Sequence, residues 1–137
     1  MKLMKQKILI DTQIFLWTFL EPKRFKLSAK TFLKESDNKF YLSHVSSWEI
    51  AITYCIGKLK LPKPPEELIR EILFLSDYEH LPIRLKHIFG TYSLPLVHCD
   101  PFDRLLVSQA KEEKMALLTT DRNLMKYKIK ILKLSEL

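Results

Sequence analysis

Short apolar runs alternate along the chain with longer stretches in which apolar residues recur every three or four positions. Residues 7–10 form the first run, in which Lys7 is followed by three apolar residues, two of them the β-branched Ile8 and Ile10. Such a run is typical of a strand buried on both faces of a sheet. Similar runs predict strands at 40–43, 116–119 and 130–133. A short strand at 81–83 is expected at a sheet edge, because Pro82 cannot donate to a neighbouring strand.

The stretches between these runs have helical spacing. They predict helices at 12–20, 28–36, 45–56, 66–75, 85–92 and 101–114. Ser28 and Asp100 are candidate N-caps, and Gly57 is a candidate C-cap. Alternating strands and helices predict an α/β fold with a mostly parallel sheet and helices on both of its faces.

The composition is that of an ordinary globular protein. The 137 residues correspond to one domain, here 1–137, with 47% hydrophobic and 28% charged residues. The 2 glycines leave no room for a glycine-rich phosphate loop. Cys55 and Cys99 are expected as buried, unpaired thiols. No signal peptide or membrane span is visible, which predicts a cytoplasmic protein without membrane contacts.

The net charge of +7 favours a polyanionic partner such as nucleic acid, although a solvated lysine-rich surface would account for it equally well.

Two aspartates follow predicted strands. Asp11 comes directly after the run 8–10, and Asp121 comes two residues after the run 116–119. Parallel α/β sheets bind ligands at the carboxyl ends of their strands, so both side chains are expected at the functional edge. The alternative is that each simply caps the segment that follows it.

Two further acids lie in predicted helices. Asp103 falls one turn inside the helix that Asp100 would cap, where an N-terminus is expected to depress its pKa. Glu49 lies beside the apolar stripe of its helix, where a carboxylate is costly to bury unless it is paired or ligates a metal. A solvent-facing or lysine-paired Glu49 is the alternative.

Together, Asp11, Glu49, Asp103 and Asp121 would form a cluster of carboxylates that a parallel sheet could bring together. Clustered carboxylates repel one another and require cations, and oxygen ligands select hard ions such as Mg²⁺ or Mn²⁺. Zinc is not expected, because the four histidines, His44, His80, His87 and His98, lack ligand spacing.

These residues stand in segments that resemble the four motifs of the PIN-domain nucleases. The segments are ILIDTQIFLW at 8–17, SSWEIA at 46–51, HCDPFDRLL at 98–106 and LTTD at 118–121. Their order is that of the family, and their residues most resemble those of the VapC-type toxins of bacterial toxin–antitoxin pairs.

The resemblance implies a three-layer α/β/α PIN-like fold and metal-dependent endonucleolytic cleavage of RNA at a four-carboxylate Mg²⁺ or Mn²⁺ site. It implies that Asp11 and Asp103 are the most direct metal ligands, with Glu49 and Asp121 completing the catalytic set. Thr119 matches a hydroxyl residue that supports the acidic pocket, and Asp100 is retained as a helix cap. It further implies a cognate antitoxin and a homodimer.

Basic residues near these motifs could contact RNA phosphates. Arg104, Lys58 and Lys60 are the candidates for such an RNA-binding rim.

Other classes remain open. A phospho-receiver or phosphatase would use Asp11 as the phosphoryl acceptor. Such sites require a second acid one or two residues away, where this chain has Thr12 and Gln13. A PIN nuclease of RNA processing, or a catalytically silent RNA-binding or partner-binding module, would carry the same motifs.

Overall fold

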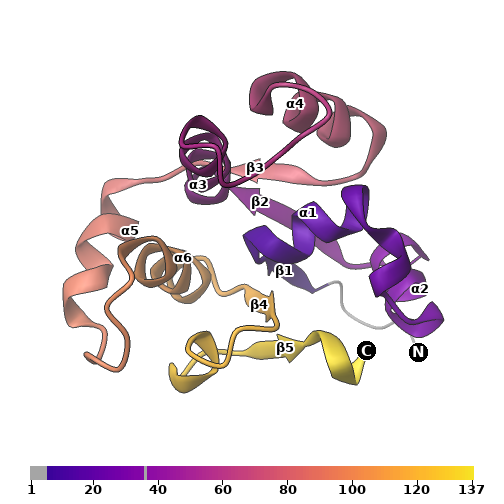
Figure 1. Ribbon diagram of the computed structural model, residues 1–137. Coiled ribbons are helices and arrows are strands. Elements are labelled where there is room, and N and C mark those ends of the chain that lie inside the picture. The colour runs from indigo at the N-terminus through magenta and orange to yellow at the C-terminus, as the bar shows by residue number, and fades with distance from the viewer. Residues whose placement is uncertain (1–5, 36) are drawn as a thin grey trace.

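The computed structural model describes residues 6–35 and 37–137 (Figure 1). Five strands are present in this part of the chain: β1 (Lys7–Ile10), β2 (Lys39–Ser43), β3 (Glu79–Leu81), β4 (Ala116–Thr119) and β5 (Ile131–Lys133). The helices are α1 (Thr12–Leu20), α2 (Leu27–Glu35), α3 (His44–Cys55), α4 (Pro65–Leu75), α5 (Leu85–Gly90) and α6 (Pro101–Glu112). Short 3₁₀ turns lie at Pro22–Arg24, Thr91–Ser93, Leu124–Lys126 and Leu134–Glu136.

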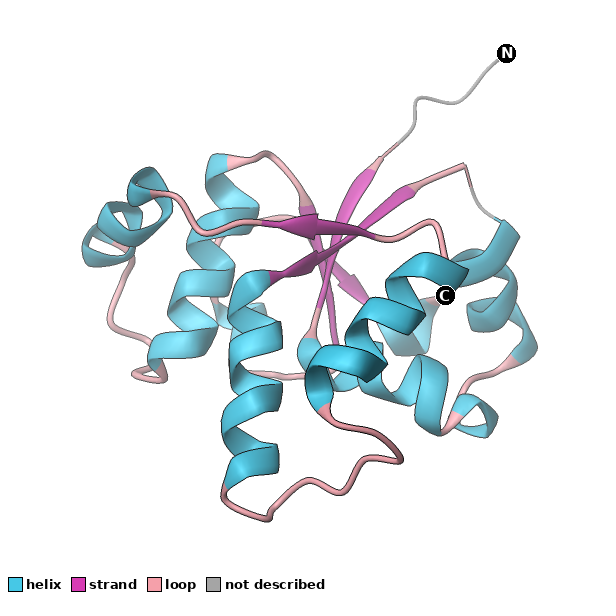
Figure 2. Cartoon of the chain, turned by 90° about the horizontal axis from the view of Figure 1, so that it is seen from above, coloured by secondary structure: helices cyan, strands magenta, loops and turns pink. Residues whose placement is uncertain are grey.

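The strands form one sheet in the order β3-β2-β1-β4-β5, and every pairing in it is parallel. The central strand β1 aligns Leu9 with Tyr41 of β2 and with Leu117 of β4. All strands therefore end at the same edge. The sheet is twisted, so its strands cross one another in the view of Figure 2.

Alternate residues of the strands point to two separate cores. Ile8 and Ile10 face one cluster, which α1, α2 and α4 cover with residues such as Phe15 and Ile69. Leu9 faces the other cluster, which is built mainly by α6 and by the segment around Tyr127. Helices thus cover both faces of a parallel sheet, which confirms the predicted three-layer α/β/α architecture.

Most predicted elements are observed with small shifts at their ends. The edge strand is β3, which ends at Leu81 directly before Pro82. The helix expected at 85–92 ends at Gly90 and continues as a 3₁₀ turn. Ser28 is not a cap, because α2 already begins at Leu27, and its hydroxyl donates to the main-chain oxygen of Leu137. Ser36, the expected end of that helix, lies outside the described residues.

Both cysteines are unpaired, as expected, but their expected burial is wrong. Cys55 is the last residue of α3, and Cys99 lies in the loop before α6; both are exposed. Helix ends and loops lie at the surface of the sheet layers, so these thiols do not reach either core.

None of the helices in the described part of the chain is both long and apolar enough to span a bilayer.

Candidate active site

A cavity of about 680 Å³ lies at the carboxyl edge of the sheet. Its lining residues come from the ends of β1 and β4 and from α1, α3 and α6, and they include all four acids of the predicted cluster together with Asp100. We refer to Asp11, Glu49, Asp100, Asp103 and Asp121 as the acid cluster. The topology therefore gathers side chains that are up to 110 residues apart in sequence, from 11 to 121, into one cavity.

Asp11 uses both carboxylate oxygens within the protein. Its Oδ1 accepts the main-chain N–H of Gln13 at 2.9 Å, which caps α1. Its Oδ2 accepts the hydroxyl of Thr119 at 2.5 Å. Asp11 therefore both caps α1 and lines the cavity, two roles that the sequence analysis treated as alternatives.

Thr119 links the two aspartates that follow strands. Its side chain is fully buried, and besides donating to Asp11 it accepts the main-chain N–H of Asp121 at 2.9 Å. The Oδ1 atom of Asp121 in turn accepts the N–H of Asn123 at 2.9 Å. The Thr119 hydroxyl therefore links the residue that follows β1 to the segment that follows β4.

Glu49 enters the cavity from α3, which Ser43 caps by accepting the N–H of Val45. The hydroxyl of Thr12 donates to Ser46 at 2.8 Å and so ties α1 to the first turn of α3. The residue before Glu49, Trp48, contacts Phe102, the residue before Asp103, with ring centroids 4.9 Å apart. This aromatic pair sets the helices that carry Glu49 and Asp103 beside each other.

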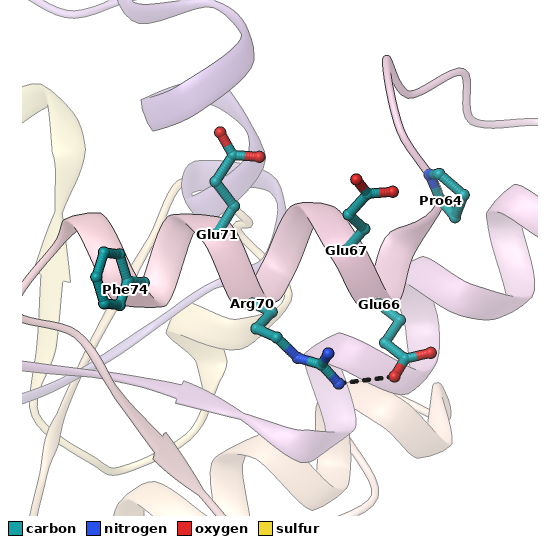
Figure 3. Close-up of a pocket in the computed structure, with 6 residues that line it drawn as sticks. All are labelled: Pro64, Glu66, Glu67, Arg70, Glu71 and Phe74. Atoms are coloured by element: carbon teal, nitrogen blue, oxygen red, sulfur yellow. Dashed lines mark hydrogen bonds and ion pairs between the residues drawn. The ribbon is translucent and has the colours of Figure 1, made fainter.

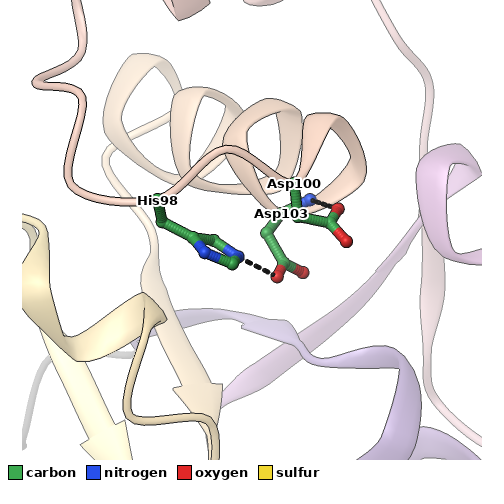
Figure 4. Close-up of side chains that lie close together, drawn as sticks. All are labelled: His98, Asp100 and Asp103. Carbon is green, nitrogen blue, oxygen red and sulfur yellow. Dashed lines mark hydrogen bonds and ion pairs between the residues drawn. The ribbon is translucent and has the colours of Figure 1, made fainter.

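Asp103 and Asp100 lie at the start of α6 (Figure 4). Asp100 is the N-cap, as predicted, since its Oδ1 accepts the N–H of Asp103 at 3.0 Å. The Asp103 carboxylate does not reach back toward the cap, because its Oδ2 lies 2.8 Å from Nε2 of His98. One ligand atom from each of His98, Asp100 and Asp103 lies within 4.8 Å of the others.

The sequence analysis missed His98. It considered each histidine only as part of a zinc motif, and His98 has no histidine or cysteine partner at such spacing. The available signal was its place five residues before Asp103, in a loop that leads into a helix N-terminus at the carboxyl edge. Among the described residues, His98 rather than one of the four predicted acids completes the tightest group of ligating side chains.

Burial and mutual repulsion disfavour the charged form in several members of the acid cluster. Burial raises the pKa of Asp11, and the negative charge of Asp121 adds to this effect, while the hydrogen bonds from Thr119 and Gln13 oppose it. Burial also raises the pKa of Glu49; Thr12 opposes this, and the charges of Asp11 and Asp100 reinforce it. The carboxylates are thus close enough to repel one another electrostatically.

The pKa of Asp103 departs from the sequence-based expectation. Its place near a helix N-terminus predicts a depressed pKa, but burial, followed by the charges of Asp100 and Asp121, raises it to about 6 despite the hydrogen bond from His98. The expectation is wrong because it counted only the helix end. Loss of water and neighbouring like charges outweigh that contribution.

No lysine or arginine within the described ranges forms a salt bridge with any member of the acid cluster. His98 is the sole cationic-type side chain within bonding distance of one of them in this part of the chain. No lysine of the described residues therefore pairs with Glu49. Half-buried carboxylates without cationic partners, all of them oxygen donors, fit a hard divalent cation.

The predicted rim cations differ in their placement. Lys58 lines the cavity, whereas Lys60 is exposed and is not among the lining residues. Arg104 is turned away from the cavity: its guanidinium donates to main-chain oxygens of the segment 91–98, including those of Thr91 and Pro95 at 2.8 and 2.9 Å. Arg104 is not among the lining residues of the cavity, and the neighbouring segment occupies its donors, so its place in the RNA-binding rim stays a prediction.

A second depression lies on the outer face of α4 and contains none of the predicted site residues (Figure 3). It also carries glutamates, but their surroundings differ. Glu66 pairs with Arg70 at 2.7 Å, and Glu71 pairs with Lys63, all on exposed side chains. Glu66 and Glu71 are therefore paired with cations of the chain, unlike the acids of the acid cluster.

The comparisons with known proteins agree with this fold. Solved structures similar to the chain include VapBC2 from Rickettsia felis bound to a promoter DNA fragment, with a TM-score of 0.64 and 18% identity over 93% of this chain and 98% of that one. DNA-bound VapBC from Salmonella typhimurium has a TM-score of 0.60 and 18% identity over 94% and 98%. FitAB bound to a DNA fragment has a TM-score of 0.60 and 15% identity over 95% and 96%. No curated protein sequence matches the chain significantly.

The fold and the cavity define an α/β/α domain with an acid-lined site at the carboxyl edge of a parallel sheet. The PIN domain family matches residues 8–130, which is nearly the whole chain. The chain therefore belongs to the PIN domain family, whose members are nucleases.

Proposed function

We propose that this protein is a metal-dependent endoribonuclease and acts as the toxin of a type II toxin–antitoxin pair. The observation that carries the proposal is the acid cluster itself. Its carboxylates line one cavity and have no Lys or Arg partner in the described part of the chain, and all of them lie within the range that matches the PIN domain family.

Asp11, Asp103 and Asp121 would hold a Mg²⁺ or Mn²⁺ ion, with Glu49 as a further ligand or as the acceptor of a proton from the attacking water. The bound ion supplies Lewis acidity, which stabilises charge on the phosphodiester and lowers the pKa of water. Thr119 keeps Asp11 and Asp121 in register by bonding to both. Hydrolysis of this kind needs no covalent enzyme intermediate, and none of the described residues that line the cavity is Ser or Cys.

RNA would approach an acidic cavity only where cations flank it. Lys58 lines the cavity on one side. Thr120, which also lines this cavity, is shared with a neighbouring cavity of about 340 Å³ that Arg122 and Lys133 line. We infer that the RNA backbone runs across Thr120 between these cations, with the scissile phosphate over the acid cluster.

Two protein partners are part of the proposal. The VapBC and FitAB complexes among the similar structures support a small antitoxin that covers the acid cluster. A homodimer is supported by an exposed apolar stripe on α5 and the turn after it, at Leu85, Ile88, Phe89 and Tyr92. These positions recur every three or four residues and face away from either core. Phe15, by contrast, is fully buried and serves the core rather than an interface.

The enzymatic part is tested with purified protein and a structured RNA. Wild-type protein should cleave in Mg²⁺ or Mn²⁺, stop after chelation, and resume when the ion is restored. Asp11→Asn should be inactive, since it removes charge, while Asn still caps α1. Glu66→Gln, on the exposed face of α4, is the matched control and should cleave normally. Cleavage that survives both chelation and Asp11→Asn would refute the proposed site.

The toxin part is tested in cells, where we propose that the protein acts on cytoplasmic RNA. Expression of the wild-type chain alone should arrest growth, and the proposal requires a short DNA-binding protein encoded beside it whose co-expression relieves the arrest. Asp11→Asn should not arrest growth. Normal growth at an expression level that gives measurable RNA cleavage would leave the nuclease but exclude the toxin.

A further inference from the structure

Arg104 and Tyr127 hold the main chain of His98 in place. The His98 carbonyl oxygen accepts from Nη1 of Arg104 and from the hydroxyl of Tyr127, both at 3.2 Å. Arg104 also donates to that hydroxyl at 3.2 Å, which closes a triangle of contacts. Tyr127 is itself buried in the second core, so the triangle is anchored to the body of the fold.

The same guanidinium orders the whole segment that precedes His98. Nη2 donates to the oxygens of Thr91 and Leu94 at 2.8 and 3.2 Å, and Nη1 donates to that of Pro95 at 2.9 Å. A planar fork with several fixed donors can hold this set of carbonyls, whereas a lysine ammonium cannot reproduce its geometry. Arg104 follows Asp103 directly in sequence, so the segment is fastened to the same turn of α6 that carries the acid.

The His98 ring connects this anchored segment to the acid cluster. Its Nε2 lies 2.8 Å from Oδ2 of Asp103, and an ionised carboxylate can only accept, so the ring nitrogen carries the hydrogen. The Asp103 main chain is meanwhile fixed by its N–H bond to Asp100. One carboxylate oxygen is thereby engaged, and the other is left to the cavity (Figure 4).

From this geometry we propose that His98 is a positioning residue that orients the Asp103 carboxylate for cation binding, and that Arg104 and Tyr127 act through it. The proposal rests on the proposed function, because it assigns Asp103 as a cation ligand. Partners that orient a metal ligand typically contribute 10- to 100-fold to metal affinity or activity.

Calorimetric Mn²⁺ titration and RNA cleavage kinetics on four variants test the proposal. His98→Phe removes the donor and should weaken Mn²⁺ binding about 10- to 100-fold. His98→Gln restores an N–H donor and should recover part of that loss. Arg104→Lys and Tyr127→Phe leave the ring in place and should each weaken Mn²⁺ binding by a smaller factor, about 3- to 10-fold. Arg70→Lys, on the exposed face of α4, is the matched control and should equal wild type.

The kinetic pattern separates positioning from RNA contact. If Arg104 acts through His98, Arg104→Lys lowers kcat at fixed Mn²⁺ and leaves KM for RNA and its salt dependence unchanged. A raised KM with a changed salt dependence would instead return Arg104 to the RNA-binding rim and overturn the proposal. Thermal melting of each variant in chelator identifies any loss that comes from unfolding, and Tyr127→Phe, which removes a single hydroxyl, remains informative if His98→Phe does not fold.

Nitrogen-15 NMR of the histidine rings gives a readout that does not depend on activity. The Nε2–H signal of His98 should persist when Mg²⁺ is added. Its loss would mean that the ring itself binds the ion and would overturn the positioning role. If wild-type protein binds Mn²⁺ and cleaves RNA while all four variants match it, the positioning proposal fails and the proposed function stands. If wild-type protein does neither, the proposed function fails.

Discussion

Helix α6 has a histidine–carboxylate pair at each end, and the two pairs have opposite electrostatic surroundings. His98 lies 2.8 Å from Asp103 in the first turn, and His87 lies 2.8 Å from Glu113, the C-cap residue. The two carboxylate side chains are equally accessible, at 23% and 24%. Yet the pKa of Asp103 is raised to about 6, and that of Glu113 is lowered.

Burial at Asp103 and the neighbours of each pair together explain the difference. Glu113 accepts from Lys86 as well as from His87, and these hydrogen bonds lower its pKa. Burial raises the pKa of Asp103 by more than the hydrogen bond from His98 lowers it, and the charges of Asp100 and Asp121 raise it further. The His87–Glu113 pair fastens α5 to α6, and Lys86 pairs with its carboxylate. The His98–Asp103 pair lies in a cavity whose carboxylates have no Lys or Arg partner among the described residues, which is the property expected of a cation site.

The largest predicted effect separates the two carboxylates by activity. Asp103→Asn should reduce RNA cleavage by roughly 10³-fold or more, because a lost cation ligand removes several kcal/mol of transition-state stabilisation. Glu113→Gln makes the same chemical change at the other end of α6 and should leave cleavage unaltered. Both are measured as initial rates on one RNA at saturating Mg²⁺. Equal losses in the two variants would mean that the comparison does not identify the active site.

Divalent ions should stabilise the protein through the acid cluster alone. An ion present at 100 times its Kd adds about 2.7 kcal/mol to the free energy of unfolding, which corresponds to a rise in Tm of roughly 10 °C. Differential scanning calorimetry with Mn²⁺ and with chelator should show this rise in wild type and in Glu113→Gln. Asp103→Asn should show little of it, and a full rise in that variant would place the ion elsewhere.

Removing the carboxylate of the other pair should instead affect stability. Glu113→Ala leaves the ring nitrogen of fully buried His87 without its partner and should lower the free energy of unfolding by about 2 kcal/mol. Urea unfolding measures the change. A loss below a few tenths of a kcal/mol would show that water replaces Glu113 at this nitrogen.

The two carboxylates should also give opposite pH dependences, which is the smallest effect. The raised pKa of Asp103 favours the folded state below its ordinary value near 3.8, and this contribution is lost as the pH rises through about 6. Because Asp103 is partly exposed, we expect only about 1 kcal/mol after solvent screening. The lowered pKa of Glu113 stabilises the folded state above 4.5, its ordinary value, and this contribution is lost below it.

Urea unfolding in chelator at about pH 5 and about pH 7.5 isolates the Asp103 contribution, since Glu113 is ionised at both values. Wild type should lose more stability between them than Asp103→Asn does. Asp11 and Glu49, whose pKa values are also raised, act in the same direction in both proteins and cancel in the difference. An identical pH dependence in the two proteins would contradict the raised pKa.

Much of the fold could be predicted from the sequence because its signals are local. The apolar run at β1 and the Asp100-Pro101 start of α6 lie within a few residues of the structure they specify. The four motif acids could be placed at the carboxyl edge because parallel strands share that edge. Ser28 was misassigned as a cap because a favourable cap residue can equally lie inside a helix turn.

The contacts that refine the site could not be predicted, because they depend on side chains meeting in space. The carbonyl oxygen of His98 accepts from Arg104 and from Tyr127, the latter 29 residues further along the chain, and no local pattern indicates this pairing. In the sequence, Arg104 likewise resembles a rim cation, because nothing there indicates that main-chain oxygens accept from its guanidinium. The raised pKa of Asp103 comes first from burial and is reinforced by the charge of Asp121, which belongs to a different strand end.

Isothermal titration of Mn²⁺ into wild-type protein, Asp103→Asn and Glu113→Gln at neutral pH tests most directly whether the unpaired carboxylates form a cation site. The account predicts saturable binding in wild type and in Glu113→Gln, and binding at least tenfold weaker in Asp103→Asn. Wild-type protein that takes up no Mn²⁺, or an Asp103→Asn variant that binds it as tightly as wild type does, would contradict the account.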